Sequence, residues 1–389
     1  MKRSTNRILT THCGSLPRPD DLIELMREKE NGRPYDPAAM ALRAQESVQE
    51  TVRHQCDIGV AVVSDGEQSK SGFASYQAER FAGFSAAPAG VRTGLAGLEI
   101  EEFREYYDRY FRTAMQGAML APPVGRVCTG PVTYIGQSAV QADIENLRAA
   151  LVGNMHEEAF MPSADPLALA ALDNQFYRTQ AEYEDACIEA TRQEYQAIID
   201  AGFVLQIDDP ALGMRLWGFR ELPDDLRRKK VDERVERINF ALRGLPAERI
   251  RYHSCYGINQ GPSTRNMQLG EWAPYALRVN AQAFSFEAMN PRHMHDYHVF
   301  EDLPLPDGKM IVPGMISHGH NWVEHPQLIA EMTVRYAQLV GRENLQIGSD
   351  CGFASQAGSR EVDPKVAWAK LATLVEGAAL ATEQLWGRG

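Results

Sequence analysis

Short apolar runs alternate with longer amphipathic segments along most of this chain. Apolar positions that recur every three or four residues predict helices, and brief apolar runs bounded by turn residues predict strands. Helices are expected from Asp20 onward and at about 37–58, 174–201, 224–245 and 363–385. Strands are expected at 8–11, 60–64, 126–133, 203–207, 250–253, 283–286, 310–312 and 345–347.

Eight strands that alternate with helices predict an α/β protein with a (β/α)₈ TIM-barrel fold. We expect one domain over residues 1–389, with an extended insertion at about 70–125, after the second strand. That insertion holds an Ala/Pro/Gly-rich segment and a tyrosine-rich stretch. A doubly wound open sheet also alternates strands and helices. However, no Gly-x-Gly-x-x-Gly follows the first strand, which argues against dinucleotide binding.

Composition excludes several classes of function. Hydrophobic residues make up 44% and charged residues 24% of the chain, as in ordinary globular enzymes. The formal net charge of −12 disfavours nucleic acid as a partner, because that needs a basic face. Neither a membrane-spanning apolar run nor a signal-peptide core is present, so the expected location is cytoplasmic. The six cysteines are too scattered for a disulfide framework.

Four residues at the ends of predicted strands have the chemistry of metal ligands. His253 and Cys255 are two apart, so that they share one face of a strand end. Glu287 ends the next strand and Cys351 follows the last one. A His-x-Cys pair alone is more often a buried cysteine beside an unrelated histidine. One His, two Cys and one Glu at neighbouring strand ends suit a tetrahedral zinc ion.

Several motifs resemble the catalytic barrel of cobalamin-independent methionine synthase and its short single-barrel relatives. They cover most of the chain, in the family's order, and the zinc set and the Ile-Asp-Asp-Pro-Ala run are the most specific. The matching stretches are Thr-Thr-His-Cys-Gly-Ser-Leu-Pro-Arg at 10–18, Asp-Gly-Glu at 65–67, Gly-Pro-Val-Thr at 130–133, Gln-Ile-Asp-Asp-Pro-Ala-Leu at 206–212 and Ser-Asp-Cys-Gly at 349–352.

The resemblance implies zinc-dependent transfer of a methyl or other alkyl group to a thiol such as homocysteine, giving a thioether such as methionine. It implies that Ser15, Glu67 and Asp208 hold the amino-acid part of that thiol. The competing interpretation is that these acids only cap helices that begin at strand ends. The resemblance places a catalytic histidine acid near His318 and His320, and His318 is expected to fill that role, since histidine can donate a proton near pH 7.

The donor side departs from the family. Gln137 stands where the family carries a tryptophan that stacks on methyl-folate, so that methyl-folate and methyl-corrinoid both stay open as donors. Alternatives are an epoxide–coenzyme M transferase-like enzyme or a demethylase, a zinc hydrolase or lyase, and an inactive binding module. The loop histidines form a second metal site, a specificity loop or a plain polar loop; they are His293, His295 and His298.

Overall fold

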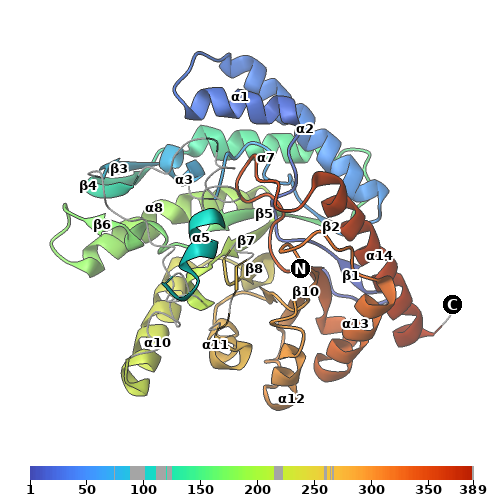
Figure 1. Ribbon diagram of the computed structural model, residues 1–389. Helices are drawn as coiled ribbons and strands as arrows, with labels where there is room; N and C mark the ends of the chain where they lie inside the picture. Colours follow the sequence, from blue (N-terminus) through green and yellow to red (C-terminus); the bar gives the residue numbers. More distant parts are fainter. Residues whose placement is uncertain are drawn as a thin grey trace.

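The centre of the protein is a sheet of eight parallel strands with helices around it (Figure 1). The computed structural model describes residues 1–73, 75–87, 101–110, 120, 125–213, 222–257, 261–262, 264 and 267–387. Neighbouring strands follow the order β1-β11-β10-β9-β8-β7-β5-β2. Their bounds are β1 Leu9–Thr10, β2 Val62–Val63, β5 Glu158–Ala164, β7 Val204–Asp208, β8 Ile250–His253, β9 Ala283–Phe286, β10 Met310–Ile316 and β11 Gln346–Ser349.

Contacts between the first and last strands of this order close the sheet into a barrel. The Ala61 amide donates to the Thr10 carbonyl at 3.2 Å. The Thr11 hydroxyl donates to the Val62 carbonyl at 3.0 Å. The predicted (β/α)₈ barrel is therefore confirmed, and the carboxyl ends of all eight strands meet at one face.

The larger helices begin where local capping signals stand. The Asp36 side chain accepts hydrogen bonds from the first turn of α2, and Thr179 and Glu182 form a capping box at the start of α8. The helices are α1 Asp20–Glu30, α2 Pro37–Asp57, α3 Ser75–Arg80, α5 Arg104–Tyr110, α7 Gln137–Leu151, α8 Gln180–Asp200, α10 Asp224–Ala241, α11 Leu269–Ala276, α12 Val299–Asp302, α13 Pro326–Val340 and α14 Pro364–Trp386.

The prediction of the third barrel strand was wrong. Residues 126–133 do form a strand, β4 (Arg126–Tyr134), but it pairs with β3 (Phe81–Ala86) and β6 (Asp173–Asn174) in a separate three-stranded sheet. The third barrel strand is β5, which contains Pro162, a residue that normally argues against an interior strand. β2 pairs only with the first two residues of β5, and the Pro162 carbonyl accepts from Lys70. The missing N–H therefore interrupts no ladder on that side.

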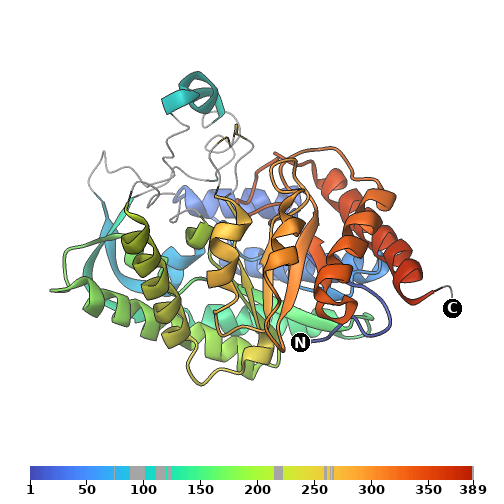
Figure 2. The ribbon, with the colours of Figure 1, turned by 90° about the horizontal axis from the view of Figure 1, so that it is seen from below.

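The insertion at 70–125 stays a prediction as a unit, because much of it lies outside the described residues. Within the described part, α3 and β3 follow the second strand, and α5 stands out from the body of the barrel (Figure 2). In addition, α8 begins at Gln180 rather than at the predicted residue 174, which belongs to β6. No helix among the described residues is long and apolar enough to cross a membrane.

The barrel interior carries a polar layer directly beneath the carboxyl-end face. Arg251 of β8 is 1% exposed, and its guanidinium lies 3.9 Å from the centre of the Phe160 ring. It donates to the Thr11 hydroxyl at 3.0 Å and to the His12 carbonyl at 2.9 Å. Gln206 of β7 donates to the Cys13 carbonyl at 3.1 Å. These hydrogen bonds hold the loop after β1 against the polar layer inside the barrel.

Candidate metal centre and adjoining pocket

Three predicted metal ligands converge at the carboxyl ends of β8 and β11. One ligand atom each from His253, Cys255 and Cys351 lies within 4.8 Å of the others, and all three residues are buried. His253 is the last residue of β8, and Cys351 comes two residues after the end of β11. The barrel thus brings together residues about one hundred positions apart in the sequence.

The two ring nitrogens of His253 have different surroundings. Its Nδ1 lies 3.2 Å from the Ser285 hydroxyl, whereas its buried Nε2 has no hydrogen-bond partner among the described residues. An unpartnered buried nitrogen is costly unless another group satisfies it. Burial, with a smaller contribution from Arg251, lowers the pKa of His253 to about 3, so that the ring stays neutral. A neutral imidazole is the form that binds metals.

The two cysteine ligands lie in contact with each other. A hydrogen bond with Cys255, followed by burial, raises the pKa of Cys351 well above its ordinary value. Without a metal the pair therefore holds at least one proton, and a cation would displace it. Cys13, after β1, lies 3.6 Å from His253 Nδ1 and 3.0 Å from the Ser349 carbonyl. Burial raises the pKa of Cys13 to about 12, so that it packs as a neutral thiol.

Glu287 lies next to this trio but groups with different neighbours. One ligand atom each from Glu287, His318 and Asp350 lies within 4.8 Å of the others. The Glu287 carboxylate accepts from the Tyr256 amide at 3.0 Å and from Asn290 at 2.9 Å. Burial and the nearby Asp350 raise the pKa of Glu287. The fourth predicted ligand is therefore adjacent to the centre and held by its own hydrogen bonds.

His318 lies with Glu287 and Asp350, and its ring is neutral. Both of its ring nitrogens are buried, with no hydrogen-bond partner among the described residues. Burial, reinforced by Arg292 and Lys370, lowers its pKa to about 3. Its role as a proton donor stays a prediction. His320 is more exposed and lies 3.7 Å from Glu324, away from the trio.

The three residues predicted to hold an amino acid lie beside the centre. Asp208 ends β7 and is adjacent to His253 in the register of β7 and β8. Glu67 has a left-handed backbone, with φ of 55°, and a Cβ added at Gly14 would come within 2.7 Å of its Oε1. Burial and the charge of Glu67 raise the pKa of Asp208 well above its ordinary value. The two carboxylates thus face one buried space.

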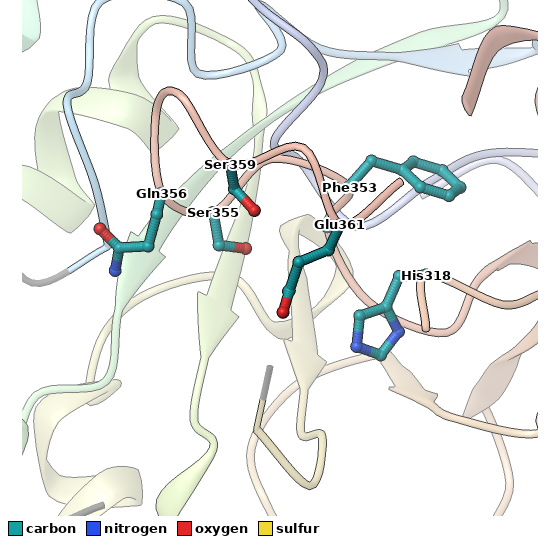
Figure 3. A pocket seen from close by; sticks show the side chains of 7 residues that line it. His318, Phe353, Ser355, Gln356, Ser359 and Glu361 are labelled. Atoms are coloured by element: carbon teal, nitrogen blue, oxygen red, sulfur yellow. The ribbon is translucent and has the colours of Figure 1, made fainter. Parts of the chain in front are cut away.

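Ser15 connects this space to the loop after β11. Its hydroxyl lies 3.1 Å from the Ser355 hydroxyl, and its carbonyl accepts from the Phe353 amide at 2.9 Å. Ser355 also lines a pocket next to His318, with Glu361 on the same wall (Figure 3). The complete lining is His318, Gly352, Phe353, Ser355, Gln356, Ser359 and Glu361.

Comparison with known proteins identifies the family of this chain. The family described as the catalytic domain of cobalamin-independent synthase matches residues 8–159 and 168–378. This chain belongs to the cobalamin-independent methionine synthase family. It is accordingly an enzyme, a methyltransferase.

Individual members of this family match the chain over all or nearly all of their length. A methionine synthase from Saccharolobus islandicus is 23% identical over 386 residues, which cover 98% of this chain and 96% of that protein. One from Sulfurisphaera tokodaii is 22% identical, covering 98% and 94%. The solved structure of a B12-independent methionine synthase from Shewanella sp. W3-18-1, in complex with selenomethionine, has a TM-score of 0.71. It is 18% identical, covers 98% of this chain and 100% of that chain, and shares the fold.

Sequence reasoning missed Lys70, which follows Glu67 by three residues. Lys70 is 4% exposed, and its Nζ lies 3.6 Å from Glu67 Oε2 and 2.8 Å from the Pro162 carbonyl. Its ammonium also lies 4.6 Å from the centre of the Tyr76 ring. A lysine three residues after an acid was a weak signal, because such pairs are common on exposed helices.

Gln137 does not lie at the carboxyl end of a barrel strand. It begins α7, and its amide donates to the Tyr134 carbonyl and, on α8, to Gln193 at 3.3 Å. Because β4 is not a barrel strand, the position that follows it is not at the barrel face where the family's chemistry is built. The missing tryptophan at Gln137 therefore gives no information about the donor in this fold.

The loop histidines are arranged as polar and packing residues. His293 is buried, contacts Asp296 at 2.8 Å and stacks on Tyr256 with ring centres 4.1 Å apart. His295 and His298 are exposed, and each has a polar neighbour of its own, Gln268 and Glu301 respectively. No candidate metal group among the described residues includes these three.

Proposed function

We propose that this enzyme binds zinc and transfers a methyl group to the thiol of homocysteine, forming methionine. The observation that carries the proposal is the trio His253, Cys255 and Cys351, whose ligand atoms lie within 4.8 Å of one another. His253 also keeps one buried ring nitrogen with no hydrogen-bond partner among the described residues. One nitrogen and two sulfur donors fit zinc better than the harder cations, which prefer oxygen. Glu287, next to the trio, is the candidate for a fourth and weaker ligand.

Zinc would supply one chemical contribution: coordination lowers the pKa of a thiol, so that the acceptor sulfur reacts as a thiolate at neutral pH. Two cysteine ligands balance the charge of the ion, which favours a reactive sulfur over acidified water. This donor set therefore supports thiol alkylation over a hydrolase or lyase reaction. His318 offers a neutral imidazole N–H at the same face and can donate a hydrogen bond to the departing group of the donor.

The charges beside the centre support an amino-acid acceptor. Glu67 and Asp208 provide two carboxylates, and Lys70 provides one ammonium. The ammonium of an amino acid bound between these two carboxylates would interact favourably with both. Burial and the charge of Glu67 raise the pKa of Asp208, and a bound ammonium would offset the repulsion between the two carboxylates.

The test is methyl transfer with purified, zinc-loaded protein. Homocysteine is combined separately with methyl-tetrahydrofolate, its polyglutamate form and methylcobalamin, and methionine is measured by mass spectrometry. We expect methionine from at least one donor, abolished in Cys351→Ser and kept in the matched variant Cys56→Ser. Cys56 is the control because it lies on α2, outside the trio. Methionine formation by Cys351→Ser, or none with any donor, would overturn the proposal.

A further inference from the structure

We propose that Ser355 binds the carboxylate of the acceptor thiol and selects acceptors that carry one. This inference rests on the proposed function and extends it to a residue that no motif of the chain singles out. It assigns the carboxylate contact to the loop after β11, in addition to the predicted Ser15 on the loop after β1.

The positions of the other acceptor groups fix where the carboxylate must lie. The sulfur belongs near Cys351, and the ammonium belongs at Glu67 and Asp208. The Glu67 carboxylate lies against Gly14, the residue before Ser15. Since the carboxylate and ammonium of an amino acid share one carbon, the carboxylate falls between the Gly14–Ser15 backbone and the residues that follow Cys351.

Two hydroxyls occupy that place. A Cβ added at Gly352 would collide with the Ser15 hydroxyl and lie 3.1 Å from the Ser355 hydroxyl. Both side chains therefore lie over the bare backbone of Gly352, 3.1 Å from each other. The Ala354 amide donates to the Ser15 hydroxyl at 3.4 Å. Ser15 can thus accept from the amide and donate to Ser355, which leaves the Ser355 proton for a ligand.

Of the two serines, Ser355 is the one that faces the pocket. Ser15 is 2% exposed and does not line it, whereas Ser355 is partly exposed and does. Figure 3 shows the Ser355 side chain in the same pocket as His318. The backbone holds Ser355 in place, since its carbonyl accepts from the Phe73 amide at 2.9 Å. Arg18 secures the same loop through the Ala354 carbonyl at 2.8 Å.

The experiment measures binding rather than turnover. Calorimetry on the zinc-loaded protein compares homocysteine with 4-mercaptobutanoate, which lacks the ammonium, and 3-aminopropane-1-thiol, which lacks the carboxylate. For Ser355→Ala we expect Kd to rise about tenfold or more for homocysteine and 4-mercaptobutanoate, because each loses a hydrogen bond to its charged carboxylate. Kd for the aminothiol stays unchanged. Ser355→Thr keeps the hydroxyl and restores binding, and Ser85→Ala, at an exposed position of β3 outside the pocket lining, has no effect.

The outcomes separate this inference from the proposed function. If Ser355→Ala binds all three thiols more weakly to the same extent, or binds none of them more weakly, the role of Ser355 is overturned. The proposed function is then left intact. A wild-type protein that binds the aminothiol but neither carboxylate would overturn the inference directly. If the wild type binds none of the three thiols, the proposed function fails, and the assignment of Ser355 fails with it.

Discussion

Gly14→Ala is the most informative single substitution near the acceptor site. Gly14 has φ of 110°, a conformation that residues with a Cβ rarely adopt. Forcing alanine into it is expected to lower the free energy of unfolding by about 1–3 kcal/mol. The new methyl group would also lie 2.7 Å from Glu67 Oε1, too close for any real contact, so that the Glu67 carboxylate must move.

Gly202→Ala is the matched control. Gly202 has φ of 91°, and a Cβ there meets nothing closer than Arg249 Nη1 at 3.9 Å. Both variants should therefore lose stability in urea unfolding through backbone strain, and Gly14→Ala should lose at least as much, because its Cβ also comes within 3.1 Å of Pro162 Cγ. Only Gly14→Ala should displace Glu67 from the acceptor ammonium, a charged hydrogen bond of about 1.5–3 kcal/mol. That energy corresponds to a loss of about ten- to a hundredfold in kcat/KM for homocysteine.

Steady-state kinetics at varied homocysteine, with unfolding curves for both variants, distinguish local displacement from general strain. The expected result is destabilisation of both variants with a kinetic defect confined to Gly14→Ala. If both variants keep wild-type kcat/KM, or lose it equally, the placement of Glu67 against Gly14 does not govern acceptor binding.

Three further predictions test other parts of the account. Burial lowers the pKa of His12 to about 3, so that only the unfolded chain binds this proton between pH 6.5 and 3. Stability should then fall below pH 6.5, by about 1.4 kcal/mol per pH unit from this residue, and urea unfolding of His12→Gln should show a shallower slope. Asp208→Asn should raise KM for homocysteine but not for 4-mercaptobutanoate, and equal effects on both would contradict an ammonium contact. Arg234 is 8% exposed and forms ion pairs with Asp165 and Asp209. Arg234→Met should cost about 3–5 kcal/mol, whereas an unchanged unfolding midpoint would refute this.

Much of the barrel could be predicted because its strands are buried on both sides and therefore apolar. The order of strands also predicted that His253, Cys255 and Cys351 lie close together, because parallel strands end at one face, and they do. Their role as metal ligands stays a prediction. The sequence did not predict the third barrel strand, because Pro162 lies within it and Glu157 and Glu158 stand at its start. The competing run at 126–133 had the stronger strand pattern and formed a different sheet.

The missed parts of the site depend on contacts that no local pattern records. Lys70 lies by Glu67 because the Pro162 carbonyl of another strand holds its ammonium. Ser355 meets Ser15 across 340 residues, over a glycine whose missing side chain makes room for both hydroxyls. Such side-chain pairs form only when the barrel closes and brings distant strands together. No short stretch of sequence therefore predicts them.

Zinc-edge X-ray absorption on the purified protein, with and without homocysteine, tests the central claim most directly. The account predicts two sulfur neighbours at rest, from Cys255 and Cys351, and three when homocysteine is present. The Cys351→Ser variant should lose one sulfur in both states. A protein that binds no zinc, or a sulfur count that stays at two with homocysteine bound, would contradict the account.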